Sequence, residues 1–219
     1  DGAGVVGCVT KRDWSVGVAM LARAGGNITG ASVGVGGLDC TVKCFVLLKE
    51  ATPGLSRVAV LLDPENYLSP RFAGEVQKAA RPLGLKLEVF EAANAAGLEK
   101  ALAAIGTSGA QAIFVAPSPF LTASSPAIAQ FASSRRLPTL HFSKRFTDAG
   151  GLMSYGASLE DSYRRAAAHV DKILKGAKPA DLPIDQPTRF ELVINMKTAR
   201  AIGLKVPQSV LLRANHVIE

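Results

Sequence analysis

Several features that mark common classes of protein are scarce or missing in this sequence. It has 3 cysteines in 219 residues, and this low, odd number excludes a disulfide-stapled scaffold. No apolar run reaches the 18 residues that a membrane-spanning helix needs. The chain opens with DGAGVVGCVT, which lacks the basic and apolar regions of a signal peptide. We therefore expect a chain that is cytosolic, or has had its N-terminus removed, or lacks its natural start.

Sequence motifs of catalysis and cofactor binding are also missing. There is no G-x-S-x-G elbow and no phosphate-binding G-x-x-x-x-G-K-[ST] loop, and GVGGLD at 34–39 lacks the dinucleotide-binding spacing. Cys40 and Cys44 are spaced like metal ligands, but no histidine lies near them in the sequence. The favoured interpretation is that both are small buried side chains. We expect no catalytic residues, no metal and no cofactor.

The charge pattern argues against nucleic acid as a partner. The formal net charge is +7, but lysine and arginine are spread along the chain. The two adjacent arginine pairs, Arg135-Arg136 and Arg164-Arg165, fall on helical patterns, where a solvated face is the ordinary reading. No basic patch with interleaved aromatic residues is present, so we predict no nucleic-acid binding.

What the sequence does have is an alternation of apolar strands and amphipathic helices. Strands are predicted at 57–63, 86–92, 112–118 and 138–143, with helices at 69–81, 96–106 and 125–136 between them. Further strands are predicted at 27–33, 151–157 and 189–195, and helices at 38–52 and 159–175. This order is typical of an α/β fold with a parallel sheet and right-handed crossovers.

The helix predicted at 159–175 has clear ends. Ser158 is placed as its N-cap with Asp161 three residues on, and Gly176 follows its end. One face of this helix carries the apolar side chains. They are Leu159, Tyr163, Ala166, Val170 and Ile173.

Polar and aromatic side chains gather where three of the predicted strands end. Ligands of open parallel sheets bind beyond the carboxyl ends of the strands, so these residues are the candidate binding site. They are Asp63, Asn66, Tyr67, Ser69, Ser118, Phe120, Phe142, Ser143 and Phe146. Ser69-Pro70 has the form of an N-cap with proline at the first helical position, and such a helix start favours an anion. The alternative is that all of these are ordinary capping and turn residues.

Three prolines, Pro179, Pro183 and Pro187, stiffen the stretch between the helix at 159–175 and the last strand. We interpret this stretch as a crossover between two lobes, with GGNITG and GGLMSYG as two further crossings. The predicted lobes are 1–34 plus 151–180, a partial first lobe, and 35–150 plus 181–219, a second α/β lobe. Three connections between two lobes are typical of a hinged protein with a ligand in the cleft.

Three segments together carry a family resemblance. ARAGGNITGAS, LLKEATPGLSRVAVLLDPEN and the stretch from AGGLMSYGASLEDSYRRAAAHVDKILKG to the C-terminus resemble substrate-binding proteins of bacterial ABC importers. These have a periplasmic-binding-protein type I fold, and some are linked to tryptophan or tyrosine uptake. The likeness covers about 21–219. It implies Rossmann-like lobes, a periplasmic location, no catalysis, a small amino-acid-like or carboxylate solute, and permease and ATPase subunits as partners.

The resemblance also implies ligand contacts from 63–69, 118–120 and 142–146. In the pose we expect, the helix start at Ser69 and the hydroxyls of Ser118 and Ser143 hold a carboxylate, and Phe120 and Phe142 pack on the side chain of the solute.

The chain departs from the family before its middle. Family members have a longer first lobe, so this chain is expected to be N-terminally truncated, with an uncovered first-lobe face that favours self-association. VTKRDW and TVKCFVLLKE also differ from the usual family residues at those places. Two alternatives stay open: an enzyme of a flavodoxin-like or racemase-like class using His141 and Asp63, and a truncated remnant that binds nothing.

Overall fold

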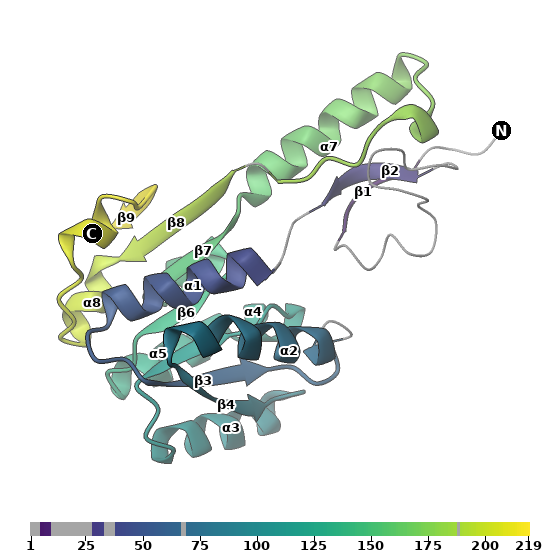
Figure 1. Ribbon diagram of the computed structural model, residues 1–219. Coiled ribbons are helices and arrows are strands. Elements are labelled where there is room, and N and C mark those ends of the chain that lie inside the picture. The colour runs from purple at the N-terminus through teal and green to yellow at the C-terminus, as the bar shows by residue number, and fades with distance from the viewer. Residues whose placement is uncertain (1–4, 10–27, 33–37, 67–68, 188) are drawn as a thin grey trace. The chain divides into compact units, whose positions relative to one another are not determined.

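Figure 1 shows the computed structural model of the chain, which describes residues 5–9, 28–32, 38–66, 69–187 and 189–219. The chain divides into two compact units. The first comprises Asp1–Val35 with Ala157–Phe190, and the second comprises Gly36–Gly156 with Glu191–Glu219. The chain therefore passes from one unit to the other three times. Compared with the predicted lobes, 151–156 fall in the second unit and 181–190 in the first.

The second unit is built on a seven-stranded sheet of order β4-β3-β5-β6-β7-β8-β9. Its strands are β3 (Arg57–Leu62), β4 (Lys86–Glu91), β5 (Ala112–Val115), β6 (Thr139–His141), β7 (Met153–Ala157), β8 (Phe190–Asn195) and β9 (His216–Ile218). The pairs from β4 to β7 are parallel, as is β8 with β9. The N–H of Asn195, at the end of β8, donates to the carbonyl of Leu152, just before β7, so these two strands run in opposite directions. The sheet is mixed and mostly parallel.

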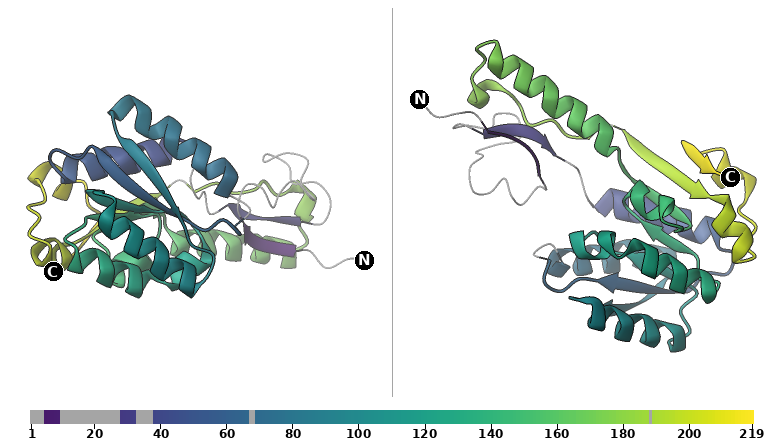
Figure 2. Two further views of the ribbon diagram at one scale, coloured as in Figure 1. Left: turned by 90° about the horizontal axis from the view of Figure 1, so that it is seen from below. Right: turned by 180° about the vertical axis from the view of Figure 1, so that it is seen from behind.

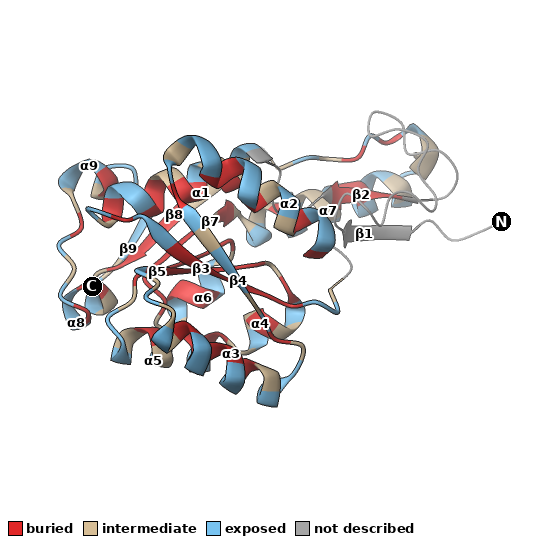
Figure 3. Cartoon of the chain, turned by 60° about the horizontal axis from the view of Figure 1, so that its bottom comes forward, coloured by how far each residue is buried: buried red, intermediate tan, exposed pale blue. Residues whose placement is uncertain are grey.

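Helices cover both faces of this sheet, as Figures 1 and 2 show. One face carries α1 (Leu38–Ala51) and α2 (Ser69–Ala80), and the other carries α3 (Ala95–Thr107), α4 (Pro119–Ala123), α5 (Ser125–Ser134) and α6 (Lys144–Asp148) (Figure 3). Two short helices, α8 (Met196–Ala201) and α9 (Gln208–Leu211), lie near the C-terminus. Two layers of helices around one sheet bury the central strands on both sides, which explains their continuous apolar sequences.

The core has a different composition on each face of the sheet. Toward α1 and α2, the rings of Phe45, Phe72 and Phe142 surround Phe114 with centroid distances of 4.8, 6.0 and 5.5 Å. The other face is mainly aliphatic, with Ile113 and Val115 of β5 packed among side chains of α3 to α6. Successive residues of a strand point to opposite faces, which places Phe114 and its two neighbours in separate layers. Figure 3 shows these strands as buried and the outer faces of the helices as exposed.

The first unit contains a short parallel pair and one long helix. β1 (Val5–Val9) pairs in register with β2 (Ile28–Ser32), and α7 (Leu159–Leu174) contacts both strands. As predicted, Ser158 is the N-cap of α7, and its side chain accepts from the N–H of Asp161 at 3.4 Å. Gly176, with φ +98°, follows the end of the helix in the left-handed region that glycine favours.

The proline-rich stretch folds back onto the first unit after a short 3-10 turn at Pro179–Asp181. The N–H of Asp185 donates to the carbonyl of Gly30 at 3.0 Å, and Thr29 Oγ1 donates to the carbonyl of Leu182 at 3.2 Å. From α7, both ring nitrogens of His169 lie against carbonyl oxygens, those of Arg165 at 3.0 Å and Pro183 at 2.9 Å. The stretch is therefore part of the first unit rather than a crossover, and the crossing comes later, between Phe190 and Glu191.

The apolar face predicted for α7 lies mostly open to solvent. Of its members, Leu159 is 37% exposed, Tyr163 63% and Val170 43%. Leu174, next to this face at the end of the helix, is 82% exposed, whereas the buried residues of the helix are Ser162 and His169. The amphipathic pattern thus predicted the helix correctly, but these side chains are not buried within the chain.

Candidate functional site

The loop after β3 is organised around the carboxylate of Asp63. This side chain is only 6% exposed. Its Oδ2 accepts a 2.6 Å hydrogen bond from Ser118 Oγ, and its Oδ1 accepts from the N–H of Glu65 at 3.0 Å. Both oxygens are thus held by groups of the protein, which compensates for the cost of burying a carboxylate.

Ser69 and Asn66 tie the same loop down at two more points. Ser69 is the first residue of α2, and its hydroxyl donates to the carbonyl oxygen of Asp63. The Ser69 N–H donates to the carbonyl of Asn66 at 2.8 Å, and the Asn66 amide donates to the carbonyl of Pro117 at 2.8 Å. The loops after β3 and β5 are therefore joined twice, once by Asn66 and once by the bond between Asp63 and Ser118.

Ser118 has a second role as the N-cap of α4. Its hydroxyl oxygen accepts from the N–H of Leu121 at 3.2 Å while the hydroxyl hydrogen goes to Asp63. β5 ends at Val115, three residues before the predicted strand end, and Pro119 opens the helix. The Ser-Pro pair here has the same form as Ser69-Pro70, so the signal for this helix was present in the sequence, although α4 is too short for periodicity to reveal.

At the end of β6, His141 holds the following loop. The Nδ1 atom accepts from the N–H of Ser143 at 2.9 Å, and Ser143 is the N-cap of α6 through the N–H of Arg145. His141 is buried, and burial lowers its pKa to about 4, so the ring is neutral at pH 7 with its proton on Nε2. The Nε2 atom is buried and has no hydrogen-bond partner among the described residues.

The three phenylalanines of the candidate site lie at different depths. Phe142 is 7% exposed and packs edge-on against Phe72 and Phe114. Phe146 is fully buried on the opposite face of the sheet, and its ring centroid lies 5.3 Å from that of His141. Phe120 is half-buried at the start of α4 and is the most accessible ring of the three.

The structure thus brings the predicted residues to one edge in two layers. Asp63, Ser69 and Ser118 form a buried polar layer, with Phe142 and Phe146 in the core beneath. Asn66, Phe120 and Ser143 are partly exposed. Tyr67 lies outside the described residues. The hydroxyls of Ser69 and Ser118 already donate within the protein, which restricts what they can offer to a ligand.

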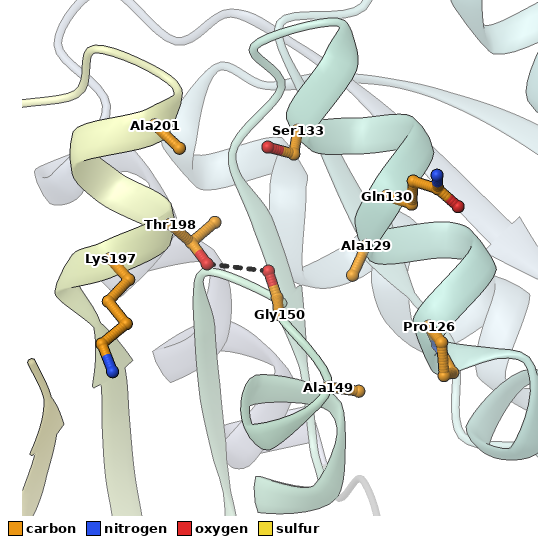
Figure 4. A pocket seen from close by; sticks show the side chains of 9 residues that line it. All are labelled: Pro126, Ala129, Gln130, Ser133, Ala149, Gly150, Lys197, Thr198 and Ala201. Carbon is orange, nitrogen blue, oxygen red and sulfur yellow. Dashed lines mark hydrogen bonds between the residues drawn. The ribbon is translucent and has the colours of Figure 1, made fainter.

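A shallow pocket of about 290 Å³ lies elsewhere in the second unit. Figure 4 shows the side chains that line it. It is lined by residues of α5, of the turn before β7, and of α8, including Gln130, Ser133 and Lys197. Across its floor, Thr198 Oγ1 donates to the carbonyl of Gly150 at 2.8 Å. Because Gly150 precedes β7, the pocket lies at the amino edge of the parallel strands, opposite the edge that carries the candidate site.

Two further observations concern the described part of the chain. No three His, Cys, Asp or Glu side chains converge there as metal ligands. Of the helices in the same ranges, none is both long and apolar enough to cross a membrane.

Comparison with known proteins places the chain in a family. Residues 14–218 match the family described as ABC transporter substrate binding protein. The chain belongs to this family. The family is one of substrate-binding proteins.

Individual similar proteins extend the comparison. A tyrosine-binding protein from Clostridioides difficile (strain R20291) is 19% identical over 188 residues, which cover 86% of this chain and 53% of that protein. The chain thus spans about half the length of this relative. A structure described as an ABC domain in complex with L-Trp, from Streptococcus pneumonia, superposes with a TM-score of 0.85 at 26% identity, covering 98% of this chain and 73% of that one.

Two other solved structures support the fold alone. A conserved domain protein from Vibrio cholerae has a TM-score of 0.84 at 23% identity, covering 96% of this chain and 69% of that one. A ligand-free, open substrate-binding protein with adhesive properties from Clostridium difficile has a TM-score of 0.75 at 18% identity, covering 98% and 70%. The periplasmic-binding-protein type I-like fold expected from the sequence is confirmed.

Proposed function

We propose that this chain binds a small amino-acid-like solute with an aromatic side chain, at the carboxyl edge of β3, β5 and β6. The observation that carries this proposal is the pair of hydrogen bonds that joins the loops after β3 and β5. Ser118 donates to the carboxylate of Asp63, and the Asn66 amide donates to the carbonyl of Pro117. A binding site needs such pre-organised polar groups, because ordering them at the moment of binding would reduce affinity.

In this proposal the partly exposed layer contacts the solute. Phe120 offers a ring face for an aromatic side chain, and Asn66 and Ser143 offer polar groups. The start of α2 at Ser69 contributes its positive dipole end to a carboxylate. Asp63 and Ser118 hold these groups in place from below, Phe142 supports them, and Phe146 anchors α6. The tryptophan and tyrosine named for two similar proteins support an aromatic solute.

The proposal extends to transport. As a member of its family, the chain would deliver the solute to the permease and ATPase subunits of a bacterial importer from the periplasm, without catalysis. Closure of the two units about the three chain crossings would enclose the solute.

A thermal-shift screen of the purified chain tests the binding step. The ligands are L-Trp, L-Tyr and L-Phe, with aliphatic amino acids and small carboxylates for comparison. A ligand at a hundred times its dissociation constant stabilises by about 2.7 kcal/mol. In a chain of this size that corresponds to a rise of several degrees, at about 2–4 °C per kcal/mol. We expect the aromatic amino acids to give the largest rise.

Matched variants test whether the thermal shift comes from binding at the candidate site. Phe120→Ala and Ser143→Ala should both reduce the shift, while Leu212→Ala, an exposed apolar residue of the same unit, should leave it unchanged. A chain that melts cooperatively and responds to no ligand would overturn the proposal in favour of a remnant that does not bind. A shift that Phe120→Ala leaves intact would place the site elsewhere.

A further inference from the structure

Basic side chains follow one another along the amino edge of the sheet in the second unit, opposite the candidate site. Lys86 and Arg57 begin β4 and β3 and are paired in register. Arg136 lies in the turn before β6, and Lys197 lies in α8, which follows the oppositely directed β8. In Figure 1 this edge is on the left, where β3 begins and β8 ends. The fold thus gathers basic residues that are spread along the sequence.

Two of the arginines at this edge are held beside the end of α3. The guanidinium of Arg135 lies 5.9 Å from the centroid of the Phe131 ring, and a Cβ on Gly106 would lie 3.5 Å from its central carbon. A Cβ on Gly109, just after α3, would lie 2.9 Å from Nη2 of Arg57. The carbonyl end of a helix favours positive charge. Both groups are therefore fixed in place before a partner binds, which reduces the cost of ordering them.

Opposite charge is scarce at this edge. Ion pairs with basic residues engage two nearby acids, Glu50 and Asp148. Glu88, near the start of β4, and Glu219 are the other acidic side chains of the described chain close by. We call the exposed basic residues that have no acidic partner among the described residues the basic edge. They are Arg57, Arg81, Lys86, Arg135, Arg136, Lys197 and Arg200.

The extent of the basic edge suits a broad partner rather than a small anion. The sheet order separates β4 from β8 by five strand spacings of about 4.8 Å, so the row is about 24 Å long. The pocket of Figure 4 is shallow, and Lys197 is the charged residue in its lining. A small anion would contact one or two of these cations, whereas a surface that carries many phosphates would contact the whole row.

The surroundings of the basic edge favour lipid over nucleic acid. Guanidinium groups bind phosphate through two N–H groups, and both partners supply phosphate. Single-stranded nucleic acid also needs exposed aromatic rings on which bases stack, and the described part of the second unit exposes none. An isolated apolar side chain, Leu212, is 77% exposed beside Arg213, which pairs with Glu50 at the end of α1. Cations next to exposed apolar area are typical of proteins that bind a membrane surface.

We propose that the basic edge binds the surface of a membrane that contains anionic phospholipids, such as phosphatidylglycerol. The negative surface potential of such a membrane attracts clustered lysine and arginine side chains. Because the candidate site lies at the opposite edge of the same sheet, a chain bound in this way keeps the candidate site on the side away from the lipid. This inference does not rest on the proposed amino-acid binding.

Co-sedimentation of the full chain with vesicles tests the proposal. Vesicles of phosphatidylcholine and phosphatidylglycerol in equal parts are compared with vesicles of phosphatidylcholine alone, and we expect binding to the mixed vesicles only. Raising the salt from about 0.02 M to about 0.5 M should release the chain, because screening weakens the attraction between exposed charges and the lipid.

Two pairs of lysine substitutions separate the basic edge from the net charge. Lys86→Gln with Lys197→Gln changes the basic edge, and it should lower the vesicle partition coefficient about fivefold for each charge removed. Lys43→Gln with Lys100→Gln, at exposed positions of α1 and α3, removes the same charge elsewhere in the unit and should lower it far less. Thermal melting checks that both variants fold, and Lys197→Gln alone decides if the first pair does not.

Equal losses of binding in the two variants would overturn the proposal, because net charge alone would then explain the attraction. Failure of the unaltered chain to bind the mixed vesicles at low salt would overturn it as well. Short double-stranded DNA is the third probe. Binding to this DNA without binding to the vesicles would assign the basic edge to nucleic acid instead.

Discussion

Ser118 Oγ donates a 2.6 Å hydrogen bond to Asp63 Oδ2, and this bond connects the ends of two neighbouring strands beneath the candidate site. Both side chains are nearly fully buried. The serine also caps α4, so a single hydroxyl fixes a loop and a helix start together.

Replacing Ser118 with alanine should therefore destabilise the chain. The variant leaves one oxygen of a buried carboxylate without a donor and removes an N-cap, which together cost about 1–3 kcal/mol. Urea unfolding measures the change, with Ser134→Ala as a control, because that hydroxyl bonds a carbonyl at an exposed position. A double-mutant cycle with Asp63→Asn should show coupling between the two residues. Simple additivity would mean that the bond does not contribute.

Two glycines make a matched pair for a second prediction. A Cβ on Gly156 would lie 1.9 Å from the carbonyl oxygen of Phe142, whereas a Cβ on Gly74 in α2 would meet nothing within 4 Å. We expect Gly156→Ala to destabilise by about 1–3 kcal/mol, because the backbone beside the site must shift. Gly74→Ala should stabilise by about 0.5–1 kcal/mol through helix propensity. Thermal melting compares them, and equal effects would contradict the close approach at Phe142.

A third prediction concerns the pH dependence of stability through His141. Its pKa is about 4 in the folded chain and 6.5 as the ordinary value, so between these pH values the unfolded chain binds more protons. Stability is full above about pH 6.5 and is lost as the pH falls toward 4, by about 3 kcal/mol in total. Urea unfolding between pH 7 and 4 measures this loss.

His141→Asn tests the assignment, because an asparagine oxygen accepts from the Ser143 N–H but does not titrate in this range. The variant should lose less stability than the parent chain on acidification. His216→Asn, at an exposed position, is the control and should lose as much stability on acidification as the parent chain. If His141→Asn and the parent lose stability in parallel, another group causes the acid sensitivity.

The exposed apolar face of α7 leads to a fourth prediction, self-association. Tyr163 and Leu174 are 63% and 82% exposed. The first turn of the helix is acidic and its last turn carries Lys172, so two copies packed antiparallel would match opposite charges. Sedimentation should show association that grows with concentration and is reduced by Tyr163→Lys with Leu174→Lys. Leu212→Lys, equally exposed but in the other unit, should have no effect. A chain that stays monomeric throughout would refute this expectation.

The sequence predicted the central strands and long helices well because burial on both faces leaves a continuous apolar segment bounded by turn residues. β3 and α7, for example, match their predicted ranges to within one residue. The five-residue helices α4 and α6 were missed, since they are too short for periodicity, although Ser118-Pro119 marks the start of the first.

The candidate site was harder to predict than the fold. Residue order placed Asp63 and Ser118 at one edge, but it did not show that they bond each other instead of remaining available to a ligand. Nor did it separate Phe120, half-buried at the edge, from Phe146, fully buried in the core. Phe120 and Phe146 lie in α4 and α6, and these helices are too short for periodicity to predict which of their side chains are buried.

The pairing of β2 with the proline-rich stretch has a consequence for the order of events during synthesis. Thr29 and Leu182, which bond across this pairing, are 153 residues apart in the chain. At translation rates of about 5–20 residues per second, the early strand waits about 8–30 s for its partner to emerge. Gly36–Gly156, with most of the second sheet, is synthesised in that interval. The second unit can therefore begin to fold on the ribosome before the first has the residues it needs.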